Sequence, residues 1–105
     1  LDLAIVDRPF DSAYALQIGL ISEIVPDLEL TDRASALATR LAAGPTGAYG
    51  RIKALLRQSF DHSLETQLDF ETRAISVAAA SPDGQEGVGA FLGKRQAKFG
   101  GAPLP

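Results

Sequence analysis

"DLELTDRASALATRLAAG" (residues 27–44) decides the class of the fold. Counted from Leu30, apolar residues recur at i, i+4, i+7, i+8, i+11 and i+12, which is the spacing of one face of an α-helix. Gly44 ends the pattern, and Pro45 stands where a next helix would place its first residue. The stretch therefore predicts an amphipathic helix with a second helix directly behind it.

Two further helices are predicted downstream. "PTGAYGRIKALLRQSF" (residues 45–60) places Ala48, Ile52, Leu55 and Leu56 on one face. "DHSLETQLDFETRAISVAAAS" (residues 61–81) has Ser63 as a plausible N-cap, with an acid in the favourable first turn. Its apolar surface is wide enough to predict contact on two sides, one lined by Leu64, Leu68 and Ile75 and the adjacent one by Phe70, Ala74 and Val77.

"SPDGQEGVGAFLGKRQAKF" (residues 81–99) predicts a last helix that is rich in glycine. Gly87, Gly89 and Gly93 together weaken a helix by about 2–3 kcal/mol. Burial of Val88, Phe91 or Leu92 contributes roughly 1.5–3 kcal/mol for each side chain. The segment is therefore expected to be helical when docked and to melt when undocked, as a mobile lid does.

The N-terminal part of the chain carries weaker signals. "DSAYALQIGLI" (residues 11–21) predicts a short helix that Asp11 or Ser12 caps and Gly19 ends, and "LISEIVP" (residues 20–26) suits a short extended segment. The expected fold is all-α, with four main helices, one short helix and at most one short strand. The expected domains are a truncated connection from a missing core (1–26), a helical domain (27–99) and a flexible tail (100–105).

Composition excludes several classes of function. The chain has 105 residues, no cysteine, one histidine and a net charge of −3, which argues against disulfides, thiolate chemistry, most histidine metal sites and nucleic-acid binding. No apolar run approaches the ~20 residues that span a bilayer. We expect a cytoplasmic protein with no cofactor, metal or membrane partner. Because the sequence has no methionine, it is expected to begin inside a longer polypeptide.

The charges are distributed unevenly. Residues 61–90 hold six acids and one base, whereas residues 91–105 hold three bases and no acid. A second basic cluster consists of Arg51, Lys53 and Arg57. Two small basic patches on an acidic chain suit a phosphate-bearing small molecule or an acidic partner. Solvated helix faces, with bases placed favourably near helix C-termini, explain the pattern equally well.

No catalytic residue is predicted in the chain. His62 has Ser59 and Ser63 as sequence neighbours, but no third orienting group is apparent, so His62 is expected to be a surface turn residue. The acids Glu65, Asp69 and Glu71 are interpreted as a solvated helix face.

Phe91 and Lys94 are the candidate binding residues. At i, i+3 on a helix they would be neighbours, and an aromatic ring beside an ammonium group could take an adenine face and a phosphate from one nucleotide-like ligand. The alternative is a core phenylalanine followed by a helix-end lysine.

Three phrases, in this order and register, resemble a known family. They are "RPFDSAYALQIGLISEIVPD" (8–27), "LAAGPTGAYGRIKALLRQSFDHSLETQLDFE" (41–71) and "SPDGQEGVGAFLGKRQAKFGG" (81–101). Together they resemble the C-terminal third of the enoyl-CoA hydratase/isomerase family, the crotonase superfamily. Gly93 departs from that pattern, because a charged or polar residue is common at its position.

The resemblance implies a C-terminal trimerisation and lid domain of an enzyme that acts on acyl-CoA thioesters, with a trimer or a dimer of trimers in the parent protein and self-association of the fragment. It implies that Phe91 and Lys94 approach the adenine–ribose–phosphate end of CoA. It also implies that the oxyanion-hole donors and catalytic acids lie upstream, so that this chain is not catalytic alone. The second hypothesis is an independent helical protein-interaction module without an enzymatic parent.

Overall fold

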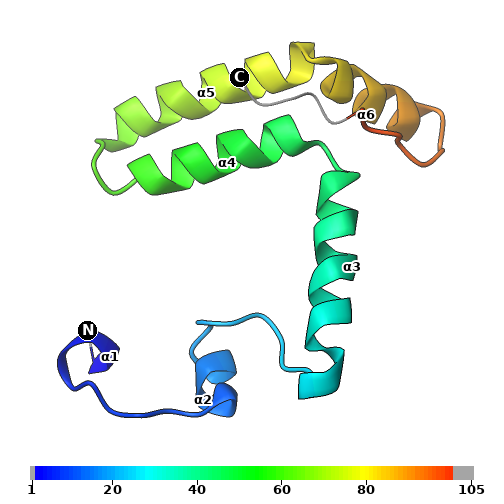
Figure 1. The fold of residues 1–105 in the computed structure, drawn as a ribbon. Helices are drawn as coiled ribbons and strands as arrows, with labels where there is room; N and C mark the ends of the chain where they lie inside the picture. Colours follow the sequence, from blue (N-terminus) through cyan, green and yellow to red (C-terminus); the bar gives the residue numbers. More distant parts are fainter. Residues whose placement is uncertain (1, 101–105) are drawn as a thin grey trace. The chain divides into compact units, whose positions relative to one another are not determined.

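The computed structural model describes residues 2–100, and all regular secondary structure in that range is helical (Figure 1). The helices in chain order are α1 (Asp2–Ile5), α2 (Ser12–Gln17), the 3-10 helix η1 (Asp27–Glu29), α3 (Leu30–Ala42), α4 (Thr46–Gln58), α5 (Leu64–Ala80) and α6 (Pro82–Leu92). The all-α prediction is confirmed, since α3 to α6 are the four main helices and α2 is the short one. The segment 20–26, for which we expected extended backbone, forms no strand.

The chain divides into two compact units, the first ending at Ser35 and the second beginning at Ala36. The first holds α1, α2, η1 and the start of α3, and the second holds the rest of α3 together with α4, α5 and α6. The predicted domain bounds, 1–26, 27–99 and 100–105, stay predictions. Most of the predicted tail, residues 101–105, lies outside the described residues.

Helix α2 begins and ends as its local sequence predicts. The Asp11 carboxylate accepts a hydrogen bond from the backbone N–H of Tyr14 at 2.8 Å, which is the N-cap interaction. At the other end Gly19 adopts a left-handed conformation with φ +74°. Two backbone bonds close around it, Leu20 N–H to Ala15 O at 2.9 Å and Gly19 N–H to Leu16 O at 3.1 Å. These paired bonds are the Schellman motif, which favours glycine at this position.

Helices α4 and α5 lie side by side as an antiparallel hairpin (Figure 1). The partly buried positions of the two helices follow helical spacing and hold small or polar residues as well as one leucine. They include Ala48, Arg51 and Leu55 on α4, Ser59 directly after α4, and Gln67, Glu71, Ala74 and Ala78 on α5. Ile52 and Leu56, which were predicted to share one face of α4 with Ala48 and Leu55, are exposed. The hairpin therefore packs on small and polar side chains around Leu55 and leaves most large apolar side chains outside it.

Ser81 forms the corner between α5 and α6. Its hydroxyl accepts from Gly84 N–H at 3.1 Å, which caps α6, and donates to Ala78 O at 2.6 Å, which closes α5. Pro82 follows as the first residue of α6, where its missing N–H costs little. Ser63 caps α5 as predicted, accepting from Thr66 N–H at 3.3 Å. Pro45, in contrast, precedes α4, which begins at Thr46 and not at the proline.

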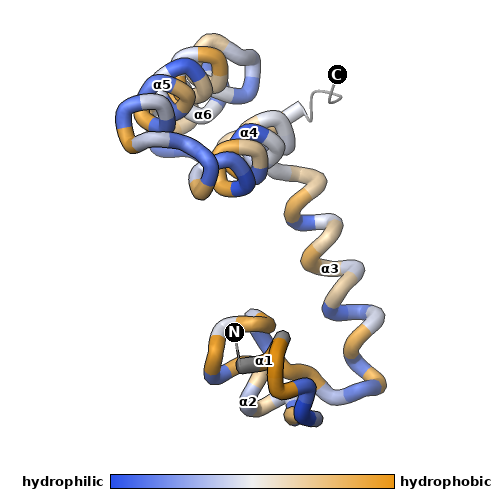
Figure 2. The backbone as a smooth tube through the Cα atoms, turned by 90° about the vertical axis from the view of Figure 1, so that its left-hand side faces the viewer, coloured by the Kyte–Doolittle hydropathy of each residue, from blue (hydrophilic) through white to orange (hydrophobic). Residues whose placement is uncertain are grey.

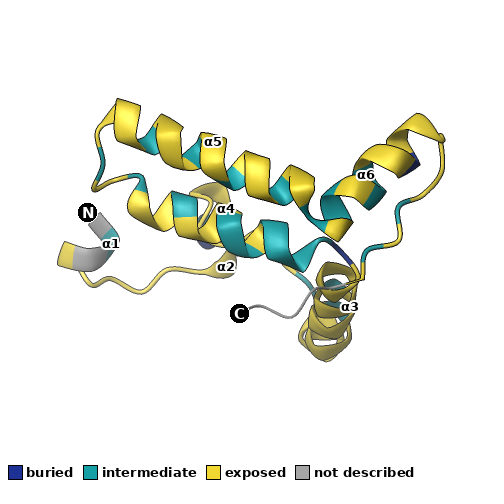
Figure 3. Cartoon of the chain, turned by 90° about the horizontal axis from the view of Figure 1, so that it is seen from above, coloured by how far each residue is buried: buried dark blue, intermediate teal, exposed yellow. Residues whose placement is uncertain are grey.

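The described residues have very little core of their own. Ala15 and Ala90, at 5% and 2% exposure, are the apolar residues that are fully buried. Hydrophobic residues recur along the helices (Figure 2), yet most residues of these helices are exposed (Figure 3). Large side chains on both predicted apolar sides of α5 are exposed, with Leu64 71% and Val77 53% exposed, whereas Ala74 is partly buried. Exposed apolar surface of this extent is typical of interaction surfaces, ligand-binding grooves and aggregation-prone faces.

Candidate functional site

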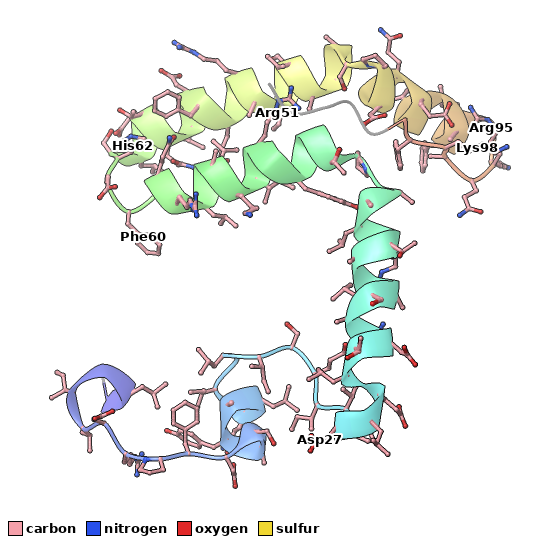
Figure 4. The ribbon with its side chains drawn as sticks, in the orientation of Figure 1. Asp27, Arg51, Phe60, His62, Arg95 and Lys98 are labelled. Atoms are coloured by element: carbon pink, nitrogen blue, oxygen red, sulfur yellow. The ribbon has the colours of Figure 1, made fainter. Side chains whose placement is uncertain are left out.

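A groove of about 1150 Å³ runs along the second unit. Its walls come from α4, from the C-terminal half of α5 and the start of α6, and from Phe99 and Gly100. The whole mid-chain basic cluster, Arg51, Lys53 and Arg57, lines it from α4 (Arg51 is labelled in Figure 4). Apolar walls with a few charged groups are typical of small-molecule sites. The structure therefore places this cluster on a concave surface.

Lys94 lies at the C-terminal end of α6 and not on the helix, which corrects the expectation of helical i, i+3 neighbours. Helix α6 ends at Leu92, and Gly93 is its C-cap residue. Lys94 has φ +47°, while Arg95 N–H donates to Ala90 O at 3.0 Å and Lys94 N–H donates to Phe91 O at 3.2 Å. This is again the Schellman motif, with lysine in the position that glycine prefers. The left-handed conformation costs a non-glycine residue about 1–2 kcal/mol.

Phe91 precedes this turn and is 83% exposed, so it is not a core residue of the described chain. Neither Phe91 nor Lys94 lines the groove along α4. The structure thus keeps the two predicted binding residues near each other in the chain, at the tip of α6, and does not bring them together with the mid-chain basic cluster. Gly93 ends the helix rather than weakening its interior, so Gly87 and Gly89 carry the interior cost.

Residues 94–100, which we call the return segment, fold back along α6. Arg95 donates from Nη1 to Glu86 Oε1 at 2.6 Å and from Nη2 to Glu86 Oε2 at 2.8 Å. The backbone N–H of Lys98 donates to Glu86 Oε1 at 2.8 Å, and that of Gly100 donates to Asp83 Oδ1 at 3.1 Å. Arg95 and Lys98 are both labelled in Figure 4. Two acids of α6 therefore hold three points of the segment.

The contact with Arg95 changes the titration of both partners. The hydrogen bond from Arg95, helped by the Lys98 N–H, lowers the pKa of Glu86 from 4.5 to about 2. The same hydrogen bond raises the pKa of Arg95 above its ordinary value. Sequence periodicity does not predict this pair, because in a helix that continues through residue 99 the side chains of Glu86 and Arg95, at i and i+9, do not meet. Gly93 is the signal that could have indicated the turn.

His62 differs from its prediction as a surface turn residue. It is half-buried, and its ring lies 4.9 Å from that of Phe70. Its Nδ1 atom is buried without a hydrogen-bond partner in the part of the chain that the structure describes. Ser63 is engaged in capping α5, so the two residues do not form a nucleophile–base pair.

The acids of α5 do not form a metal site. Glu71 accepts a hydrogen bond from Gln67 at 2.9 Å. The hydrogen bonds from the backbone and from Ser63 lower the pKa of Glu65 at the start of the helix. Among the side chains that the structure describes, no three histidine, aspartate or glutamate groups converge as metal ligands. Within residues 2–100, no helix is both long and apolar enough to cross a membrane.

Comparison with known proteins finds one family throughout. The enoyl-CoA hydratase/isomerase family model matches residues 2–102. The chain is 38% identical over 101 residues to the 1,2-epoxyphenylacetyl-CoA isomerase of Escherichia coli K12, covering 96% of this chain and 38% of that protein. It is 29% identical over 104 residues to the human mitochondrial enoyl-CoA hydratase domain-containing protein 3, covering 99% of this chain and 34% of that one.

Solved structures agree with the sequence relatives. An enoyl-CoA hydratase from Polaromonas sp. JS666 superimposes with a TM-score of 0.80 at 26% identity, over 86% of this chain and 35% of that one. An enoyl-CoA hydratase from Geobacillus kaustophilus HTA426 superimposes with a TM-score of 0.83 at 30% identity, over 93% of this chain and 37% of that one. The chain therefore spans little more than a third of the length of these relatives.

One part of the sequence-based resemblance is corrected by these matches. The prediction that the chain is the C-terminal portion of the family is not supported: the family model matches nearly the whole chain, residues 2–102, while the chain covers 38% of the Escherichia coli relative and 37% of the Geobacillus structure. What the matches support is the family itself. The chain belongs to the enoyl-CoA hydratase/isomerase family.

Proposed function

We propose that this chain is a helical acyl-CoA-binding and subunit-contact module of an enoyl-CoA hydratase/isomerase-like enzyme, in which Phe91 and Lys94 contact the nucleotide end of the CoA thioester. Family membership supports an enzymatic parent over an interaction module without one. The relatives' names refer to CoA thioesters and to hydratase or isomerase activity, and these activities are proposals for this protein.

The observation that carries the site assignment is the strained turn at Lys94. A lysine is held at φ +47°, in a conformation that glycine would adopt at lower cost, directly after an exposed phenylalanine. Local strain of this kind persists where the surrounding structure fixes it and often marks a binding site. Within residues 2–100, the Lys94 side chain has no ion pair, so its ammonium group is available to an anionic ligand.

The reacting groups are proposed to come from parts of the enzyme outside this chain. In the described residues the one histidine packs against Phe70, and several acids cap a helix or contact Gln67, Arg33, Arg95 or the return segment. That arrangement supports a role in binding and covering the substrate. We propose no pair of these groups for adding water across a double bond or for moving one.

The exposed apolar faces are proposed to be contact surfaces. Leu64, Leu68 and Ile75 are each more than half exposed, and Phe70 and Val77 extend the apolar surface around α5. In the parent enzyme, contact with the rest of the subunit and with neighbouring subunits would cover these side chains. A trimer or a dimer of trimers is the assembly that we propose.

Kinetics of the complete gene product test the function. We expect turnover of crotonyl-CoA, and we expect Lys94→Ala to raise KM for this substrate while leaving kcat nearly unchanged, because a remote contact stabilises ground and transition states alike. With crotonyl-pantetheine, which lacks the nucleotide, wild type and variant should behave alike. An equal loss on both substrates would refute the assignment of Lys94. The 105-residue chain alone should show no turnover above a boiled control.

A further inference from the structure

The backbone of Lys94 is held by its neighbours, whereas its side chain is not, and the proposed ligand contact alone does not explain this difference. Its backbone is fixed on both sides, by α6 before it and by the Glu86–Arg95 contact directly after it. Its side chain has no ion pair within the described residues. The neighbouring arginine is held firmly, and the lysine between the two fixed points is left available.

The fixing depends on one carboxylate. Glu86 receives three hydrogen bonds, two from the Arg95 guanidinium and one from the Lys98 N–H, all between 2.6 and 2.8 Å. Such a two-pronged arginine–carboxylate contact sets geometry as well as strength. Asp83, which lies i−3 to Glu86 on the same face of α6, adds the bond to Gly100 N–H. Glu86 therefore holds the part of the return segment nearest to Lys94.

The aromatic ring of Phe99 lies beside Gly87 of α6. A β-carbon added at Gly87, next to Glu86, would lie 3.7 Å from Cε1 of Phe99. Phe99 thus rests against the bare face of α6 while Glu86 and Asp83 bind the backbone on either side of it. The return segment is held by polar contacts at its backbone and by an apolar contact at its aromatic ring.

We propose that Glu86 is a positioning residue for Lys94: by holding Arg95 and Lys98, it keeps the return segment folded against α6 and fixes Lys94 in its left-handed turn beside Phe91, ready to meet an anionic group of the ligand. The ligand part of this inference rests on the proposed function. The contact by which Glu86 keeps the return segment folded against α6 does not depend on the proposed function, and it can be measured separately.

The test is a double-mutant cycle in the complete gene product, with CoA and pantetheine as probes. We expect Glu86→Ala and Lys94→Ala each to weaken CoA binding roughly two- to fivefold, the range of an exposed charged contact. The double variant should bind CoA no more weakly than Lys94→Ala alone, because both changes remove the same contact. Pantetheine affinity should not change, whereas a general loss of structure would weaken both probes. Glu86→Gln, which keeps the size and one acceptor oxygen, should act in the same direction with a smaller effect.

Limited trypsin digestion measures directly whether the return segment stays folded against α6. Cleavage after Lys94 and Arg95 should be faster in Glu86→Ala than in wild type. The matched control is Glu23→Ala, which removes an exposed carboxylate–arginine pair with Arg33 (3.0 Å) in the first unit and should alter neither cleavage nor CoA binding. Unchanged cleavage in Glu86→Ala, or a loss of CoA affinity fully additive with Lys94→Ala, would overturn the positioning role. If Glu86→Ala is cleaved faster but Lys94→Ala binds CoA as wild type does, Glu86 holds the return segment and the proposed contact between Lys94 and the ligand is refuted.

Discussion

Gly84 approaches the carbonyl oxygen of Ala78 so closely that the corner between α5 and α6 has no room for a β-carbon. A β-carbon built on Gly84 collides with that oxygen and lies 2.9 Å from the Cα atom of Ala79. Both obstacles are backbone atoms, which cannot rotate away as a side chain can. The corner that carries α6, and with it Lys94, therefore requires glycine at this position.

The first prediction concerns this corner. Gly84→Ala should destabilise the α5–α6 pair by about 1–3 kcal/mol, because the added methyl group forces the two backbones apart. Gly89→Ala is the matched control with the opposite sign: a β-carbon there meets only the Arg95 guanidinium at 4.0 Å. In that open interior position alanine should stabilise α6 by about 0.5–1 kcal/mol. Hydrogen exchange of the α6 amides measures both effects, and changes of the same sign would contradict the described corner.

The second prediction is that Lys94→Gly stabilises the turn after α6. Glycine adopts φ +47° without the cost that a lysine bears, so the gain should be about 1 kcal/mol. Lys98→Gly is the control, since Asp7 and Lys94 are the non-glycine residues with positive φ in the described chain and Lys98 is not among them. It should stabilise nothing. Slower exchange of the Arg95 amide in Lys94→Gly is the measurement, and faster exchange would count against strain at this residue.

The third prediction is a pH dependence of the return segment. The Arg95 hydrogen bond lowers the pKa of Glu86 from 4.5 to about 2, so the folded state binds this proton less readily than the unfolded state does. The contribution of the contact should therefore be complete above about pH 4.5 and lost as the pH falls toward about 2. Carboxyl carbon NMR follows the titration. In Arg95→Ala the Glu86 midpoint should rise, and an unchanged midpoint would show that Arg95 is not the cause.

A fourth prediction is self-association of the 105-residue chain. Leu64 and Val77 are 71% and 53% exposed on two sides of α5, and large apolar patches of this kind usually find a partner. Analytical ultracentrifugation should show species larger than a monomer, with a smaller share in Leu64→Ser combined with Val77→Ser. Thr72→Ser, at an exposed polar position of the same helix, is the control. A monomer at every concentration would argue against contact surfaces on α5.

The sequence predicts the ends of the helices well where a capping residue acts on backbone groups close to it in the chain. Asp11, Gly19 and Ser63 act on backbone groups within a few residues, so their identity and spacing were enough. The apolar pattern of α4 and α5 was correct for helix formation but did not show which side packs within the hairpin. Ile52 and Leu64 are exposed in the described chain, and the hairpin itself packs on small and polar side chains around Leu55.

The candidate site could be predicted only in part. Phe91 and Lys94 were identified by residue type, yet their relation was wrong, because Gly93 appeared to be a weak point inside a longer helix and is in fact its C-cap. The pairing of Glu86 with Arg95 depends on the chain reversing at Lys94. A hydrophobic periodicity does not predict where the chain reverses, and the usual signal for such a turn, a glycine in the left-handed position, is absent because that residue is a lysine.

CoA binding and local stability, measured together on Lys94→Gly in the complete gene product, test the central claim most directly. If Lys94 is held in a strained turn in order to meet the nucleotide end of CoA, this variant should bind CoA roughly two- to fivefold more weakly than wild type while its α6 end becomes more stable. The loss in affinity should shrink as salt is added, because the contact is ionic and exposed. A variant that is more stable and binds CoA as tightly as wild type would contradict the claim.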